Sequence, residues 1–150
     1  MRWLERFPNL IIVRTFSKVY GLAGLRVGFG LMHPGVADLL NRVRQPFNVN
    51  SISLAAAAAA LDDHEFVRKS HELNLAGMAQ MTAGLNNLGL EYIPSYGNFV
   101  TFKVRDAKAV NLALLKAGVI VRPIEGYGMP EYLRVSIGTE AENIRFLSVL

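Results

Sequence analysis

The chain has 150 residues, of which 51% are hydrophobic and 19% are charged, and it contains no cysteine. This composition predicts a packed core rather than a disordered chain, and it excludes disulfides and cysteine-ligated zinc. Charged residues interrupt each apolar stretch before it reaches the length of a membrane-spanning helix. We therefore expect a cytoplasmic protein that does not insert into a membrane.

The net charge of +4 is concentrated in the first third of the chain. Residues 1–50 carry seven basic and two acidic side chains, whereas residues 51–150 carry nine and ten. A basic excess is common in proteins that bind nucleic acid, but here the basic residues are scattered and form no run. A site for an anionic small molecule is favoured. The alternative is a non-catalytic module that binds an anion or a nucleic acid.

The first part of the chain predicts two strands and a helix. Residues 10–13 form a continuous apolar run, which is typical of a strand buried on both faces in a parallel sheet. Four glycines within residues 19–31 predict a loop followed by a second strand near 26–31. His33 and Pro34 end that strand, and Pro34 suits the first turn of a helix that reaches about Arg44.

Two helices are predicted in the middle of the chain. Ser51 or Ser53 is expected to cap an alanine-rich helix, because serine accepts a hydrogen bond from a free N–H group at a helix start. A long helix over about 63–88 follows, and Gly89 is expected to end it. Its apolar face comprises Met78, Met81, Leu85 and Leu88.

The remainder alternates short strands with helices. Asp106 is expected to cap one helix, which Gly118 ends. Thr139 and Glu142 have the spacing of a capping box and predict the start of the last helix. The predicted strands lie at 91–93, 98–104, 119–123 and 132–136. The pattern indicates an α/β protein.

Lys18 follows the first predicted strand and precedes the glycine-rich loop. A lysine amine in such a place can attack an aldehyde, although a surface lysine at a strand end fits the position alone. Thr15 and Ser17 add two hydroxyl groups beside it, and Arg26 adds a guanidinium eight residues later. Hydroxyls, positive charge and approachable backbone are what a phosphate dianion requires.

Residues 14–28, RTFSKVYGLAGLRVG, closely resemble the cofactor-lysine motif of the class I and II aminotransferases of fold type I. This resemblance implies an α/β fold and the cofactor pyridoxal 5'-phosphate (PLP). It implies that Lys18 binds the cofactor covalently and that Thr15, Ser17 and Arg26 hold its phosphate.

A second stretch, residues 121–139, resembles the C-terminal signature of the histidinol-phosphate aminotransferases. The resemblance implies that Arg134 binds the α-carboxylate of the substrate and that Arg122 contacts the substrate's phosphate. Without the family, Arg134 would be assigned to a salt bridge at a strand edge. Asn98 is expected to form a turn that shapes the same pocket.

The resemblance extends from about residue 8 to residue 150 and implies the C-terminal part of a larger enzyme. Residues 1–50 would end the large PLP-binding domain, and residues 51–150 would form bridging helices and the small domain. In this family the aspartate that pairs with the pyridine nitrogen lies upstream of the lysine, so we expect the chain to be a fragment that is inactive alone.

The implied reaction is transamination between L-histidinol phosphate and 2-oxoglutarate in histidine biosynthesis, carried out by a homodimer. An aromatic aminotransferase and a threonine-phosphate decarboxylase are the alternatives within the same class of enzymes, because they share the lysine motif. Neither a metal nor a nucleic acid is expected to take part.

Overall fold

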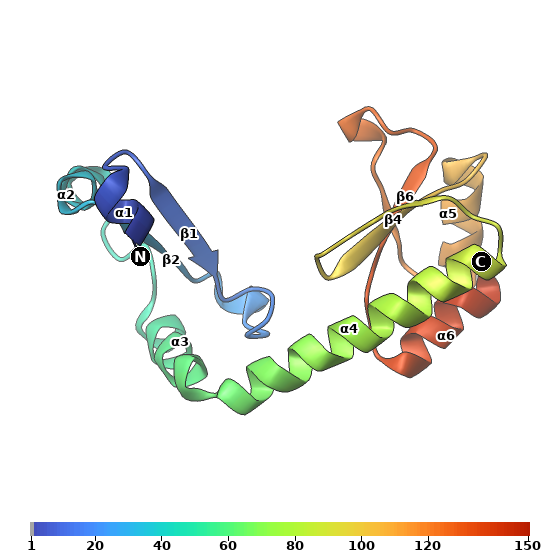
Figure 1. Ribbon diagram of the computed structural model, residues 1–150, viewed down its shortest axis with the longest axis horizontal. Helices are drawn as coiled ribbons and strands as arrows, with labels where there is room; N and C mark the ends of the chain where they lie inside the picture. The colour runs from blue at the N-terminus through green and yellow to red at the C-terminus, as the bar shows by residue number, and fades with distance from the viewer. Residues whose placement is uncertain (1) are drawn as a thin grey trace. The chain divides into compact units, whose positions relative to one another are not determined.

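The structure, a computed structural model, describes residues 2–150 (Figure 1). The chain divides into two units: unit 1 reaches to Ser70, and unit 2 runs from His71 to Leu150. The boundary lies within the long helix α4 (His64–Asn87). Among the residues described, no helix is both long and apolar enough to cross a membrane.

Unit 1 is built on a ribbon of two antiparallel strands, β1 (Ile11–Thr15) and β2 (Gly28–Met32). The prediction that the first strand is buried on both faces of a parallel sheet is wrong. Within residues 2–150 this strand pairs with β2 alone, and Val13 is 74% exposed. The connection between the strands is short and holds only turns and the 3-10 helix η1 (Ala23–Leu25), whereas parallel pairing needs a long crossover.

Besides the beginning of α4, unit 1 contains the helices α1 (Arg2–Arg6), α2 (Pro34–Val43) and α3 (Ser51–Asp62). Helix α2 begins at Pro34, as predicted. The cap expected at Ser51 or Ser53 is instead Asn50, whose side chain accepts a hydrogen bond from the Ser53 N–H at 2.8 Å. Ser53 lies inside the first turn of α3, so its hydroxyl does not cap the helix.

The alanines of α3 allow this helix to pack closely against the connection between β1 and β2. Ala57 is buried in one cluster with Phe16 and Val27, which lie at the two ends of that connection. A small side chain brings the helix backbone near its neighbour at little cost in conformational entropy. The alanine-rich helix therefore supports the segment that carries Lys18.

Unit 2 contains a four-stranded antiparallel sheet with the strand order β3-β4-β6-β5. Its strands are β3 (Tyr92–Ile93), β4 (Phe99–Lys103), β5 (Arg122–Pro123) and β6 (Tyr132–Ser136), and the 3-10 helix η2 (Glu125–Tyr127) follows β5. Strand β5 is shorter than the predicted 119–123. Two further helices, α5 (Ala107–Lys116) and α6 (Glu140–Val149), belong to this unit.

One face of this sheet is covered by helices, and the other carries polar side chains. Val100 and Phe102 pair directly with Val135 and Leu133, so all four project from the same face. They share a buried cluster with residues of α4, α5 and α6, namely Met81, Leu85, Ala107, Leu114 and Phe146. The opposite face carries the arginines that the sequence assigns to substrate binding.

The helix ends described next lie where the sequence predicts them in unit 2. Gly89 and Gly118 have φ values of +68° and +79°, the left-handed conformation that ends α4 and α5. Asp106 caps α5 by accepting a hydrogen bond from the Ala109 N–H. The expected apolar face of α4 is shorter than predicted, because Leu88 is 47% exposed.

The capping box at the start of α6 gives the stability of unit 2 a dependence on pH. The Thr139 N–H donates to the Glu142 carboxylate at 2.8 Å, and this bond, with a second from the Thr139 hydroxyl, lowers the pKa of Glu142. A lowered pKa means that the ionised form stabilises the folded state. This contribution is present above the unfolded pKa of glutamate, about 4.3, and is lost as pH falls through the folded pKa.

Glu142→Gln is therefore expected to lower the stability of unit 2 at neutral pH, and the difference from wild type should vanish at acidic pH. Thermal unfolding at pH 7 and at a pH below the folded pKa measures this. Glu140→Gln is the control, because it removes the same charge from the same helical turn outside the capping box. Equal effects of the two substitutions would contradict the prediction.

Candidate functional site

The turn after β1 holds Lys18 on the surface of unit 1. Phe16 is only 3% exposed, its N–H donates to the Val27 carbonyl at 3.2 Å, and its own carbonyl accepts from the Leu22 N–H at 2.9 Å. The Gly21 N–H donates to the Lys18 carbonyl at 2.8 Å. Gly21 has a φ of +69°, which a residue with a side chain rarely adopts. The backbone around Lys18 is thus fixed while its side chain stays exposed.

Thr15 and Ser17 lie together at the start of this turn. The Thr15 hydroxyl oxygen accepts a hydrogen bond from the Ser17 N–H at 3.0 Å. A hydroxyl that accepts through its oxygen still has a proton to donate. Thr15 is therefore oriented by the backbone and can donate to an oxyanion, and the half-buried Ser17 offers a second hydroxyl.

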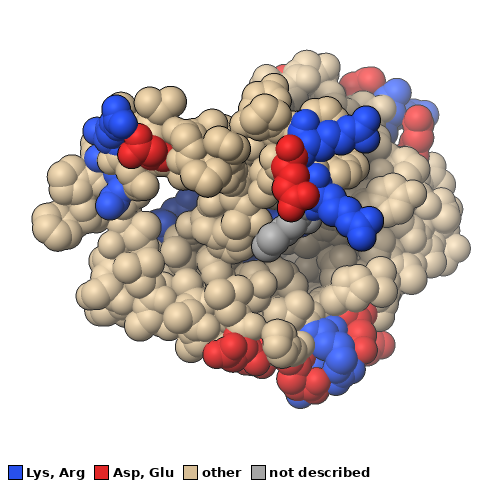
Figure 2. Space-filling model, turned by 60° about the vertical axis from the view of Figure 1, so that its left-hand side comes forward, with Lys and Arg blue, Asp and Glu red and all other residues tan. Residues whose placement is uncertain are grey.

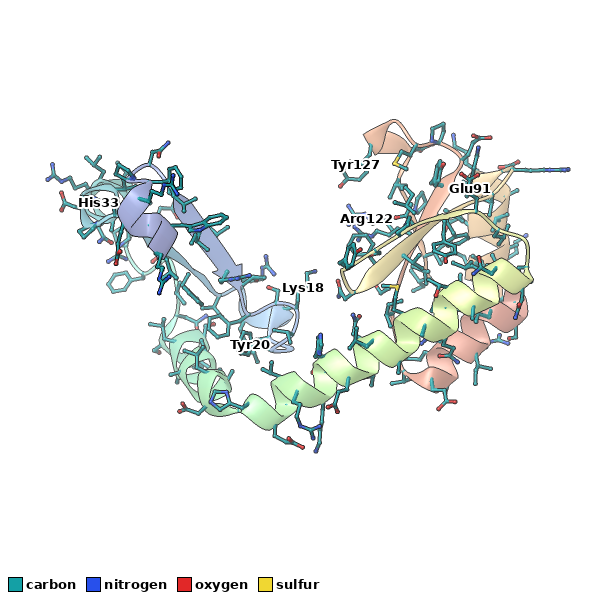
Figure 3. The ribbon with its side chains drawn as sticks, in the orientation of Figure 1. Lys18, Tyr20, His33, Glu91, Arg122 and Tyr127 are labelled. Atoms are coloured by element: carbon teal, nitrogen blue, oxygen red, sulfur yellow. The ribbon has the colours of Figure 1, made fainter. Side chains whose placement is uncertain are left out.

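An open hollow of ≈520 Å³ lies beside this turn, within the range of sites for small molecules. Thr15 and Lys18 line it, whereas Ser17 and Arg26 do not. The other lining residues are Val13, Arg14, Val19, Tyr20 and Phe29. Lys18 and Tyr20 extend from the same turn (Figure 3). The hollow thus combines an amine and a hydroxyl with aromatic surface.

Arg26 ends the short helix η1 in an uncommon backbone conformation. Its φ of +52° and ψ of +43° are left-handed, which few residues other than glycine adopt. One guanidinium nitrogen donates to the Ala23 carbonyl at 2.9 Å. A guanidinium has five N–H groups, so this bond orients Arg26 and leaves other donors for a ligand.

The residues of this segment carry functional groups of the kinds that can bind PLP. Lys18 supplies an amine that can react with the cofactor's aldehyde, and Thr15, Ser17 and Arg26 supply the hydroxyl and guanidinium donors that a phosphate dianion needs. All four lie in one hydrogen-bonded segment of unit 1.

In unit 2 the structure brings Arg122 and Arg134 together. They are directly paired across β5 and β6, and Arg134 also pairs with Thr101 of β4, so the three side chains share the polar face of the sheet. The Arg134 guanidinium carbon lies 4.6 Å from the centre of the Phe99 ring, which is a cation–π distance. Like charges directly opposite each other destabilise a sheet.

Within the described part of the chain, neither arginine forms an ion pair with a carboxylate. Lys103 on β4 is different. It pairs with Glu131 at 3.5 Å, and the negative charge of Glu131 raises the pKa of Lys103. Two arginines that face each other without an acidic partner form a site to which an anion can bind.

Asn98 directly precedes Phe99 in the sequence, and its carbonyl accepts a hydrogen bond from the Ile137 N–H at 2.9 Å. It therefore links the start of β4 to the end of β6. The expected role of its side chain in the pocket stays a prediction. No residue pattern in the sequence indicates a role for Phe99, whose ring lies against the Arg134 guanidinium. Only the pairing of β4 with β6 brings the two together, and no local pattern predicts that pairing.

The family model "Aminotransferase class I and II" matches residues 2–150. The chain therefore belongs to the class I and II aminotransferases.

Individual relatives within this family are histidinol-phosphate aminotransferases. The chain is 66% identical over 148 residues to histidinol-phosphate aminotransferase 1 of Dechloromonas aromatica, covering 99% of this chain and 41% of that protein. It is 68% identical over 148 residues to histidinol-phosphate aminotransferase of Methylobacillus flagellatus, covering 99% and 40%. The chain thus spans about 40% of the length of these relatives.

A solved structure also resembles this chain. It is histidinol-phosphate aminotransferase from Sinorhizobium meliloti in complex with pyridoxal 5'-phosphate. The identity is 32% and the TM-score is 0.86, and the match covers 94% of this chain and 40% of that one. The match confirms the expected α/β fold of a fold-type I aminotransferase.

Proposed function

We propose that this chain supplies the cofactor lysine and the substrate-binding arginines of a PLP-dependent aminotransferase that acts on L-histidinol phosphate. The observation that carries the proposal is the turn of unit 1, where Lys18, Thr15, Ser17 and Arg26 form one hydrogen-bonded segment. Because the chain spans about 40% of its relatives' length, the proposal concerns its contribution to the reaction.

In unit 1, the Lys18 Nζ would bind the cofactor aldehyde and, once displaced by the amino substrate, accept the proton from the substrate's Cα. Arg26, Thr15 and Ser17 would hold the phosphate with charge-assisted hydrogen bonds. When bound, PLP supplies an electron sink for the pair released at Cα.

In unit 2, Arg134 would hold a carboxylate of the keto-acid acceptor, and Arg122 would contact the phosphate of the amino substrate. A guanidinium binds either group through two parallel hydrogen bonds, and the cation–π contact with the Phe99 ring helps to hold Arg134 in place. The repulsion between the two arginines favours a ligand that carries two negative charges. This supports a phosphorylated amino donor and, in the second half of the reaction, a dicarboxylate acceptor such as 2-oxoglutarate.

Several further points belong to the same proposal. The protein would act as a homodimer in the cytoplasm, with residues 1–50 completing the large domain and residues 51–150 forming the bridging helices and the small domain. Alone, the chain would bind PLP weakly and would not transaminate. On the face shown in Figure 2, Lys and Arg side chains are scattered among other residues and form no continuous basic patch, which disfavours a nucleic-acid module.

Borohydride reduction in the presence of PLP, followed by peptide mapping, tests the proposal. Reduction converts the reversible adduct between a lysine amine and the aldehyde into a stable secondary amine. We expect Lys18 to be labelled more than the exposed Lys116, because the phosphate donors beside it raise the local concentration of the cofactor. The chain has five lysines, so the others are references within the same sample.

Uniform labelling of all five lysines would contradict the proposal. Salt-sensitive DNA binding without preferential labelling of Lys18 would instead indicate a nucleic-acid module. Lys18→Arg is the matched variant, because it keeps the positive charge and removes the reactive amine.

A further inference from the structure

Ser53 is a buried hydroxyl that the proposed reaction does not use. Its exposed fraction is 0%, and its Oγ donates to the Leu25 carbonyl at 2.9 Å across 28 positions of sequence. The Ser53 N–H is itself held by the Asn50 side chain at 2.8 Å. Ser53 is therefore held by hydrogen bonds at both its backbone and its side chain, and its hydroxyl points to the residue that precedes Arg26.

The bond from Ser53 acts on the peptide group that joins Leu25 to Arg26. A peptide group is planar, so a hydrogen bond to its carbonyl also orients its N–H. The Arg26 N–H at the other end of this group donates to the Ala23 carbonyl at 3.4 Å, a long distance for such a bond. The bond at the carbonyl end is thus the shorter of the two.

Arg26 needs such support because its backbone is left-handed. Its φ of +52° is unfavourable for a residue with a side chain and persists when the surroundings hold it. The rotation about φ of Arg26 is set by the orientation of the same peptide group that Ser53 contacts. Without that contact, Arg26 is free to return to a common conformation, which would swing its guanidinium away from the turn.

We propose that Ser53 is a positioning residue for Arg26, through its hydrogen bond to the Leu25 carbonyl. It would act on cofactor affinity only through the phosphate, and it would touch neither cofactor nor substrate. The inference rests on the proposed function of Arg26. It predicts a selective loss: Ser53→Ala weakens the preference for a phosphorylated aldehyde and leaves the reactivity of Lys18 toward an unphosphorylated one unchanged.

The test compares labelling of the chain by PLP and by pyridoxal, the same aldehyde without the phosphate. Lys18 labelling is divided by Lys116 labelling in each sample, and the ratio of the two values defines the phosphate preference. We expect Ser53→Ala to lower this preference about fivefold, the factor that corresponds to the net contribution of one ordinary hydrogen bond. Ser53→Thr keeps the hydroxyl and should retain the preference.

A cycle with Arg26→Ala separates positioning from general damage to the fold. If Ser53 acts through Arg26, the double variant has the same phosphate preference as Arg26→Ala alone. An unchanged rate of Lys18 labelling by pyridoxal shows that the turn of Ser53→Ala is intact, and a changed rate would mean that Ser53 only maintains the fold, which overturns the inference.

The remaining outcomes distinguish this inference from the proposed function. A wild-type preference that Arg26→Ala removes and Ser53→Ala leaves intact would refute the role of Ser53 alone. No phosphate preference at Lys18 in the wild type would refute the proposed cofactor site, and the inference with it.

Discussion

Replacement of Phe102 by alanine is expected to destabilise unit 2 by about 3–5 kcal/mol, the usual cost of removing a buried aromatic ring. Phe102 is 0% exposed and lies on β4, between Tyr92 of β3 and Leu133 of β6. Its ring meets that of Phe146 edge to face, with centroids 5.6 Å apart. Three strands and a helix converge on this side chain, so the cavity left by alanine has little freedom to collapse.

Hydrogen exchange of the backbone amides in β4 and β6 measures this effect within unit 2. Exchange through unfolding should accelerate by more than about a hundredfold, the factor that corresponds to the lower end of the expected loss. Tyr96→Ala is the matched control. It removes a fully exposed aromatic ring from the connection between β3 and β4, and its effect should stay within about 0.5 kcal/mol. Similar effects of both substitutions would contradict the assignment of the core.

The sequence predicts elements well where the signal is local. Gly89 and Gly118 end their helices because the left-handed conformation that closes a helix favours glycine. Thr139 and Glu142 form the expected capping box because each satisfies a free donor of the other within one turn. These interactions involve residues that are close in sequence, so the residue pattern contains all the information that they need.

The sequence fails where the outcome depends on distant residues. The apolar run 10–13 is typical of a strand in a parallel sheet, but it gives no information about the partner of β1. The short connection between β1 and β2 is what favours their antiparallel pairing. Ser53 looked like a cap because serine favours that position, but a carbonyl 28 residues away binds its hydroxyl. The pairing of Arg122 with Arg134 likewise depends on the register of two strands.

The candidate site also has some features that the sequence predicts and others that it does not. The family resemblance assigned a role to Lys18, Thr15 and Arg26, and these assignments stay predictions until the labelling experiments are done. Spacing in sequence could not show that Thr15 is oriented by the Ser17 N–H or that Arg26 is left-handed. Both features arise from the path of the backbone between β1 and β2.

Gly28→Ala is expected to disrupt that path. Gly28 pairs with Thr15 across the ribbon, and a Cβ atom at position 28 would lie 2.6 Å from the carbonyl oxygen of Arg14. This oxygen belongs to the backbone of the neighbouring strand, so the end of β1 must move. Overpacking of this kind typically costs about 1–3 kcal/mol. Displacement of Thr15 would also break its bond with the Ser17 N–H and abolish the phosphate preference of Lys18.

Gly24→Ala supplies the matched control in the same connection. No atom lies within 4 Å of a Cβ at position 24, and its φ is not positive, so alanine should be neutral or stabilise unit 1 by about 0.4–1 kcal/mol by restricting the unfolded chain. Amide exchange at Phe16 and Leu22, whose N–H groups close the turn, should accelerate in Gly28→Ala only. If Gly28→Ala left both exchange and labelling unchanged, the close approach of β2 to the end of β1 would not determine the geometry of the Lys18 turn.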